Sequence, residues 1–196
     1  MPETGDTNFS WREFVRRNND ELVATYGNLV NRVLTFVYRS FDGCVPVPGE
    51  FDSLSQNVME DAKAIFDTMG GLICKCHFRE AIRSAMSLAQ EANRYLEEKS
   101  PWKAINEDRQ AAATALYVAI SVISCLRTVL YPFLPFSSQK LHQYLGFEGS
   151  VEGDGWQPRF PSPGQKLLPP EPLFSKLDEG LIEEEVSRVG HVEHNL

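Results

Sequence analysis

The sequence predicts an all-α protein: an antiparallel bundle of about five helices, followed by an irregular C-terminal extension. Apolar residues recur at three- and four-residue spacing in long segments, and prolines and glycines separate these segments. No convincing strand pattern with a period of two residues is present. We expect 1–8 to be a flexible lead, 9–147 to form the bundle, and 148–196 to form a Gly- and Pro-rich extension that packs on a neighbour or hangs free.

The first helix is expected to begin at Ser10, which forms a capping box with Glu13 three residues later. One buried stripe follows, made of Phe14, Val15, Leu22, Val23, Leu29, Val30, Val33, Leu34 and Val37. Gly27 interrupts this stripe, and a glycine inside a helix costs about 1 kcal/mol relative to alanine. We expect another backbone or a ligand to come close there. The loop over 41–49, with its prolines and glycines, ends the helix.

Four later segments have helical patterns. The second helix is expected from Ser53 or Ser55 to Met69, because Gly70-Gly71 follows. The third begins near Cys76 or Phe78 and ends before Pro101, since the residue preceding proline avoids helical angles.

The fourth helix, over about 107–130, is rich in alanine and apolar on nearly every side, so it should be the central, buried member. Pro132 and Pro135 end it, and a short fifth helix follows over about 137–145. Residues 173–189 are compatible with one acidic amphipathic helix.

The charge is unevenly distributed. The chain carries a net charge of −8 and has a pI of about 5.1. The deficit lies in 41–70 and 148–196, whereas 9–40 and 71–103 are mildly positive. A chain this acidic should not coat nucleic acid indiscriminately, although it can present a local basic face.

The composition indicates a soluble cytoplasmic domain. Four cysteines in 196 residues do not make a disulfide scaffold, which favours a reducing compartment. Residues 1–6 have neither a basic nor an apolar region, so we expect no secretion signal. The longest uncharged run, 111–126, is shorter than the roughly 20 residues of a bilayer span, so we expect no membrane contact.

Motifs for catalysis are missing from the sequence. It has no glycine-rich phosphate loop, no Gly-x-Ser-x-Gly elbow and no His-Glu-x-x-His helix. The stretch Cys74-Lys-Cys76-His77 hints at a metal, but zinc needs four ligands, usually as two separated pairs, and a second pair is lacking. We therefore predict no catalytic residue and no metal site.

Three side chains suit the recognition of an unpaired base. Asn28 and Arg32 are four residues apart and project from one helix face, where an amide and a guanidinium can read the edge of a base. Trp102 follows Pro101 near the end of the third helix and can serve as a stacking platform. Single-stranded RNA is read by this combination of stacking and edge hydrogen bonds. The alternatives are that Trp102 is a packing residue and that Asn28 and Arg32 only brace the helix.

Four motifs carry a family resemblance. Residues 14–32 contain Phe-x-x-Arg-x-Asn-x-Glu-Leu and then Asn-Leu-x-x-Arg, and 41–46 read Phe-Asp-Gly-x-Val-Pro. Residues 93–102 read Asn-x-Tyr-Leu-x-x-x-x-Pro-Trp, and 130–135 read Leu-x-Pro-Phe-Leu-Pro. Over 9–147, in this order, the chain resembles the anticodon-binding domain of the methionyl-tRNA synthetases, which are class I enzymes. The tail around Phe174 is similar to the family segment that returns toward the catalytic domain.

The resemblance implies a partner and a site. Asn28 and Arg32 fall on the positions that hydrogen-bond the first anticodon base, a cytosine, while Trp102 falls on the tryptophan that stacks on it. Pro101 falls on a neighbour that lines the same pocket. The implied function is recognition of the CAU anticodon in the anticodon loop of methionine tRNA, coupled at long range to aminoacylation. Arg17, Asn18 and Asp20 lie within the first helix motif, and we expect their roles to be mainly structural.

The chain lacks the family's catalytic domain, with its ATP-binding sequences His-x-Gly-His and Lys-Met-Ser-Lys-Ser. We therefore expect a fragment that binds no cofactor, since ATP and Mg²⁺ serve the parent enzyme, and that cannot activate methionine alone. Its other partner is the missing N-terminal catalytic domain. Binding of RNA by the isolated domain should be weak, because phosphate contacts dominate affinity. The alternatives are a free-standing tRNA-binding module without synthetase activity and a helical interaction domain that binds no RNA.

Overall fold

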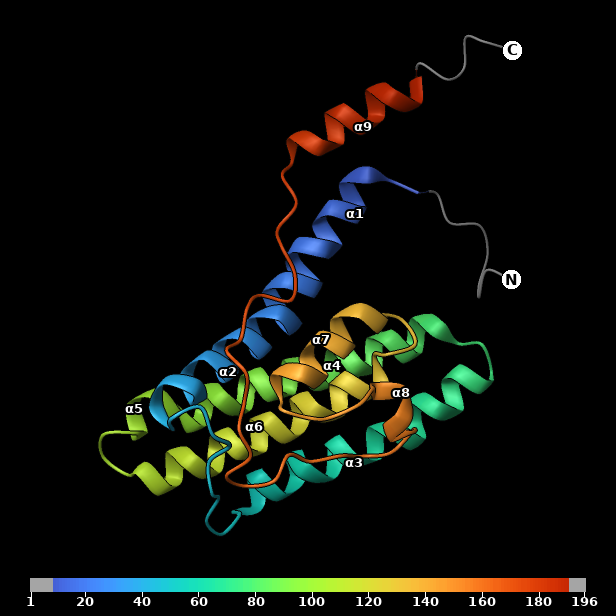
Figure 1. The fold of residues 1–196 in the computed structure, drawn as a ribbon. Helices are drawn as coiled ribbons and strands as arrows, with labels where there is room; N and C mark the ends of the chain where they lie inside the picture. The colour runs from blue at the N-terminus through green and yellow to red at the C-terminus, as the bar shows by residue number, and fades with distance from the viewer. Residues whose placement is uncertain (1–8, 191–196) are drawn as a thin grey trace.

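A computed structural model describes residues 9–190, which form a bundle of helices without a β-strand in that range (Figure 1). The predicted all-α bundle is confirmed. The expected flexible lead, 1–8, and the last part of the extension, 191–196, lie outside the described residues.

The first long segment is a rod of three consecutive pieces: α1 (Trp11–Arg17), η1 (Asn18–Gly27) and α2 (Asn28–Ser40). Its blue end, α1, projects away from the other helices, whereas α2 lies against them (Figure 1). The middle piece, η1, is a π-helix. The apolar spacing indicated one regular helix and did not reveal this wider stretch, which in other proteins often accompanies a functional site.

The capping box at the start of the rod forms only in part. The Ser10 hydroxyl accepts a hydrogen bond from the backbone N–H of Glu13 at 3.4 Å, as predicted. The Glu13 carboxylate accepts from Arg16 and Arg17 at 2.7–2.8 Å. Hydrogen bonds from these two guanidinium groups lower the pKa of Glu13 to about 2, and the hydrogen bond from Arg16 contributes most.

Helix α3 (Ser53–Cys74) packs against α4 (Phe78–Lys99), and the prediction that Gly70-Gly71 ends α3 is wrong. The helix continues because the missing side chain of Gly70 makes room for the indole of Trp156. A Cβ atom on Gly70 would lie 3.1 Å from Trp156 Nε1, which donates a hydrogen bond to the Phe66 carbonyl.

Helix α5 (Pro101–Ala104) is a single turn, and α6 (Arg109–Val129) is the central helix of the bundle. Asp108 caps α6 by accepting from the Ala111 N–H at 2.9 Å. Helix α6 is long and apolar enough to cross a membrane, yet 94% of that apolar window is buried among the other helices. The prediction that this helix is the buried member is confirmed.

Three helices follow: α7 (Pro135–Tyr144), α8 (Val151–Asp154) and α9 (Gly180–Gly190). Pro135 occupies the first turn of α7, so the helix begins two residues before the predicted 137. The acidic helix expected over 173–189 begins only at Gly180.

The extension packs along the bundle. Val151 and Leu167 are buried, and the chain from α8 to α9 runs beside the rod (Figure 1). A Cβ atom on Gly27 would meet the Phe174 ring at 3.1 Å. A side chain of the extension, and not the expected second backbone or ligand, therefore lies close to Gly27, together with the Leu22 carbonyl of the helix itself.

A buried charged cluster joins the extension to the core. Arg127 of α6 is fully buried and forms an ion pair with Asp154 of α8 at 3.1 Å. Arg159 forms a second ion pair with Asp154. The Nδ1 atom of His142 lies 2.6 Å from Arg127, and its Nε2 atom lies 3.1 Å from the Glu148 carbonyl. Removal of water from this cluster lowers the pKa of His142.

Candidate RNA-base pocket

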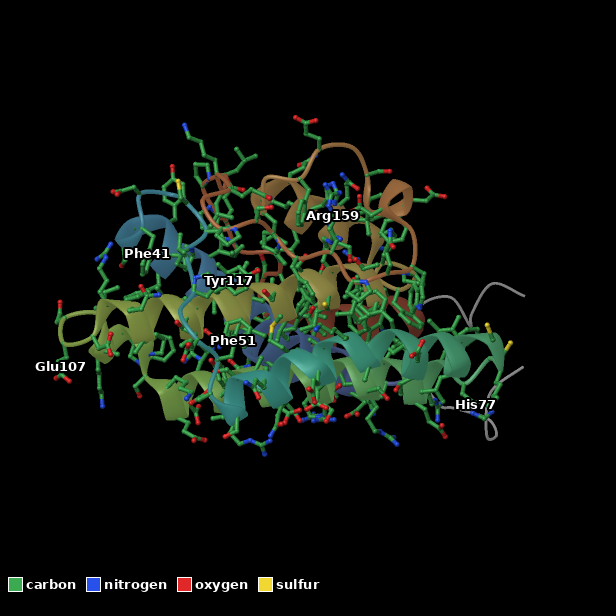
Figure 2. All side chains as sticks on the ribbon, turned by 90° about the horizontal axis from the view of Figure 1, so that it is seen from below. Phe41, Phe51, His77, Glu107, Tyr117 and Arg159 are labelled. Carbon is green, nitrogen blue, oxygen red and sulfur yellow. The ribbon has the colours of Figure 1, made fainter. Side chains whose placement is uncertain are left out.

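Three of the four residues predicted for the site line one pocket. Asn28, Arg32 and Trp102 surround a volume of about 720 Å³ between α2 and α5. The pocket lies at the end of the bundle that contains α5. Glu107, which follows α5, lies at the opposite end of the bundle from His77 (Figure 2). The sequence prediction that these three side chains converge therefore agrees with the geometry.

The backbone between α4 and α5 fixes the position of Trp102. Ser100 ends α4 in a left-handed conformation, with a φ of 41°. Pro101 starts α5 and is buried, so it sets the direction of the turn but does not line the pocket itself. The indole is half-buried and meets the Phe36 ring edge-to-face, with centroids 6.3 Å apart. It therefore lies neither in the hydrophobic interior nor free in solvent.

Arg32 lies on the indole. Its guanidinium carbon is 4.4 Å from the centre of the Trp102 ring, a cation–π contact. Its Nη2 atom donates a hydrogen bond to Asn93 Oδ1 at 3.3 Å, while its buried Nε has no hydrogen-bond partner among the described residues. Partial burial lowers the pKa of Arg32, and the carboxylate of Glu97 opposes this change. The Arg32 guanidinium nevertheless remains charged, because arginine is not deprotonated in proteins.

Several lining residues were not singled out in the sequence. Asn28 is exposed at the start of α2, and side chains at three- and four-residue spacing continue along the same wall of the pocket, a pattern that could have identified Phe36 and Arg39. The opposite wall comes from the end of α4 and from α5. The additional lining residues are Asn31, Thr35, Phe36, Arg39, Glu97, Ser100 and Lys103.

The remaining residues of the first motif lie outside this pocket. Asn18 donates a hydrogen bond to the Ser175 carbonyl at 3.1 Å and so binds the extension. Arg17 pairs with Glu13, and Asp20 is exposed on the rod. These contacts fit the mainly structural role that the sequence indicated.

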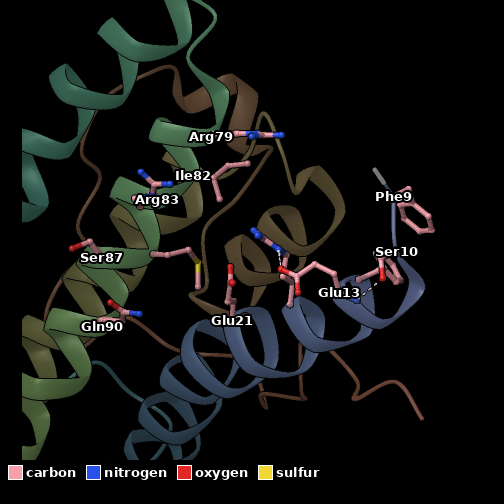
Figure 3. Close-up of a pocket in the computed structure, with 12 residues that line it drawn as sticks. Phe9, Ser10, Glu13, Glu21, Arg79, Ile82, Arg83, Ser87 and Gln90 are labelled. Atoms are coloured by element: carbon pink, nitrogen blue, oxygen red, sulfur yellow. Dashed lines mark hydrogen bonds and ion pairs between the residues drawn. The ribbon is translucent and has the colours of Figure 1, made fainter. Parts of the chain in front are cut away.

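A larger groove of about 920 Å³ lies between α1 and the first half of α4 (Figure 3). Figure 3 shows Glu13 and Glu21 on the side of the rod toward Ile82 and Arg83 of α4, with Phe9 just before the rod begins. None of the four predicted site residues lines it. Its walls contain no tryptophan, so it does not offer the indole that the base-recognition hypothesis requires.

The hint of a metal site is not supported by a cluster of ligands. Cys74 and Cys76 are exposed at the turn between α3 and α4, and Nδ1 of His77 lies 3.5 Å from Glu80. Within residues 9–190 there is no group of three or more side chains suited to hold a metal ion.

Two family models match the sequence. The model of the anticodon-binding domain of methionyl-tRNA ligase matches residues 45–193, and the model of the class I tRNA synthetases for methionine matches residues 1–34. The second match ends within α2 and the first begins after it, so most of the rod falls in the match to the class I synthetase model.

Curated relatives have the same assignment. The chain is 57% identical over 190 residues to a methionine–tRNA ligase of Dehalococcoides mccartyi, a match that covers 97% of this chain and 34% of the relative. It is 44% identical over 214 residues to the methionine–tRNA ligase of Chloroflexus aurantiacus, covering 96% of this chain and 36% of the relative. The chain thus spans about a third of the length of these relatives.

The fold agrees with a solved structure. The ligand-free methionyl-tRNA synthetase of Mycobacterium tuberculosis superposes with a TM-score of 0.83 at 26% identity, covering 91% of this chain and 37% of that protein. Sequence and fold therefore lead to one assignment: the chain belongs to the family of methionyl-tRNA ligase anticodon-binding domains.

Proposed function

We propose that the pocket between α2 and α5 binds the first base, a cytosine, of the CAU anticodon of methionine tRNA. One observation carries the proposal: the Arg32 guanidinium lies 4.4 Å from the Trp102 ring centre, in a pocket that Asn28 also lines. The half-buried indole and the hydrogen-bonding groups of Asn28 and Arg32 thus border the same space, in which a flat ligand would stack on the exposed part of the ring.

The side chains match the edge of a cytosine. Cytosine presents an amino donor beside two acceptors, its ring nitrogen and its carbonyl oxygen. Arg32 supplies donors for the acceptors, and the amide oxygen of Asn28 can accept from the amino group. Uracil reverses the donor and acceptor at two of these positions, so it would leave polar groups unpaired, which costs affinity. The buried Nε of Arg32 has no hydrogen-bond partner among the described residues, so it is a donor that a base acceptor in the pocket would satisfy.

The charges around the pocket favour a short stretch of RNA over a long duplex. Arg39 and Lys103 are exposed lining residues and can contact the flanking phosphates. Glu97 lies on the same pocket and repels phosphate. With a net charge of −8, the isolated chain should bind tRNA weakly, and much of the binding energy would come from the rest of the parent enzyme.

We also propose that the parent protein attaches methionine to tRNA in the cytoplasm, and that this chain works with the parent's N-terminal catalytic domain. ATP and Mg²⁺ would act in that domain, so the isolated chain should not activate methionine. ATP–pyrophosphate exchange above background by the purified chain would contradict this point.

Footprinting on methionine tRNA tests the proposed function. The chain should protect nucleotides centred on the anticodon loop, and it should bind a CAU stem-loop more tightly than a stem-loop whose first anticodon base is uracil. Protection elsewhere would favour a general tRNA-binding module. Absence of protection at high concentrations of the chain would favour a helical interaction domain that binds no RNA.

A further inference from the structure

Asn93 of α4 connects three parts of the site without lining the pocket. Its Nδ2 atom donates to the Thr25 carbonyl at 3.2 Å and to the Ala89 carbonyl at 3.1 Å. Its Oδ1 atom accepts from Arg32 Nη2 at 3.3 Å. The side chain is half-buried, and it is not one of the residues that line the pocket.

The contacts with Thr25 and Ala89 use both N–H donors of the Asn93 amide. An asparagine has two N–H donors, and both point to backbone carbonyl oxygens, which cannot donate. The oxygen must then face the guanidinium, because the opposite amide orientation would bring oxygen against two carbonyl oxygens. The orientation of the acceptor that Arg32 meets is therefore determined by the backbone of α4 and of η1.

The contact with Thr25 reaches the end of the π-helix. Thr25 lies two residues before Gly27, where η1 ends and α2 begins with Asn28. The Thr25 hydroxyl donates to the Asp20 carbonyl at 3.1 Å, five residues earlier, as the wider turn of a π-helix allows. Asn93 thus contacts both the turn from which Asn28 projects and the side chain of Arg32.

We propose that Asn93 is a positioning residue for anticodon recognition: it holds the Arg32 guanidinium on Trp102 and fixes the end of η1 from which Asn28 projects. An arginine that is held before binding loses less conformational freedom when RNA arrives, which increases affinity. This inference rests on the proposed function, because it assumes that Arg32 reads the base.

A double-mutant cycle with the chain of residues 1–196 tests the inference. The probes are stem-loops of methionine tRNA with CAU or UAU as the anticodon. Asn93→Ala should weaken CAU binding about tenfold, the size expected for a lost hydrogen bond to a charged group. In the Arg32→Ala background the same substitution should have a clearly smaller effect, because the part of its effect that acts through Arg32 is already lost. Gln90→Ala removes an exposed amide from α4 outside the pocket and should leave binding unchanged.

The conservative variant separates positioning from folding. Asn93→Asp keeps an acceptor for Arg32 but loses the N–H donors to the Thr25 and Ala89 carbonyls. It should therefore reduce the ratio of CAU to UAU affinity less than Asn93→Ala, which should reduce that ratio about tenfold. The ratio is informative because an added negative charge repels both stem-loops equally. Circular dichroism and urea unfolding show which variants are folded, and the comparison uses the folded ones.

Each outcome has one interpretation. If Arg32→Ala leaves CAU binding unchanged, the proposed function itself fails. If Arg32→Ala weakens binding but Asn93→Ala does not, or if the effect of Asn93→Ala persists fully in the double variant, only the role of Asn93 is refuted. Equal ratios for the aspartate and alanine substitutions of Asn93 would also overturn it.

Discussion

Removal of the Trp102 indole is the most informative single change, because the ring belongs to both the fold and the proposed base pocket. Its two main contacts are the guanidinium of Arg32, 4.4 Å from the ring centre, and the edge-to-face Phe36 ring. The ring is half-buried in a helix of four residues. Trp102→Ala should therefore weaken RNA binding while the chain still folds.

The expected magnitudes follow from these contacts. Stacking of a base on an aromatic ring contributes about 1–3 kcal/mol, so binding of a CAU stem-loop should weaken roughly 5- to 150-fold. For folding, the lost aromatic pair contributes about 0.5–1.5 kcal/mol and the cation–π contact about 0.5–1 kcal/mol. The free energy of unfolding should thus fall by about 1–2.5 kcal/mol, less than the 3–5 kcal/mol of a tryptophan removed from a closed core.

Fluorescence anisotropy of a labelled stem-loop measures the binding, and urea unfolding followed by circular dichroism measures the stability. Trp102→Phe should retain most of the binding, because a smaller aromatic ring still stacks. Trp156→Phe is the matched control, since that indole lies at the other end of the fold, against Phe66. Unchanged affinity of a folded Trp102→Ala variant would refute the stacking role. Loss of the fold would show that the indole is a packing residue.

Three further predictions address stability and charge. Gly71→Ala should raise the free energy of unfolding by about 0.5–1 kcal/mol, because no atom lies within 4 Å of the new methyl group, whereas Gly70→Ala should lower it by about 1–3 kcal/mol through contact with Trp156. Urea unfolding of the two variants measures both changes, and changes of equal sign would contradict the packing argument. Burial lowers the pKa of His142 below its ordinary value of about 6.5, so the unfolded chain takes up the proton first and the free energy of unfolding falls as the pH drops below about 6.5. His142→Asn should flatten this dependence on pH, and an unchanged slope of unfolding free energy against pH would exclude His142 as its source. Lys103→Ala should weaken CAU and UAU stem-loops equally and reduce the slope of log K against log salt by about 1, and selective loss of CAU binding would instead indicate a base contact.

The helix boundaries that depend on local signals were predictable. Ser10 and Asp108 cap their helices through contacts that span three residues, and Pro101 is suited by its fixed backbone angle to the first turn of α5. The juxtaposition of Arg32 and Trp102 came from the family resemblance, because the residues are far apart in the sequence and their spacing alone does not bring them together.

The features that the sequence did not reveal depend on distant contacts. Helix α3 continues through Gly70 because Trp156 packs there, although the two residues are 86 positions apart in the chain. The π-helix is joined at its end to Asn93, whose motif was visible but whose bonding partners were not. A fully buried arginine such as Arg127 cannot be recognised without its partners, since arginine is usually exposed.

The buried position of Arg127 determines where the chain can be shortened. The carboxylate that balances this guanidinium is supplied by Asp154, beyond residue 147. A truncation after α7 would remove the Asp154 carboxylate and leave the Arg127 guanidinium buried without its anion, which costs about 3–5 kcal/mol. The smallest unit that keeps Arg127 paired therefore includes the segment around α8, and a shorter version would require Arg127 to be replaced by an uncharged side chain of similar volume.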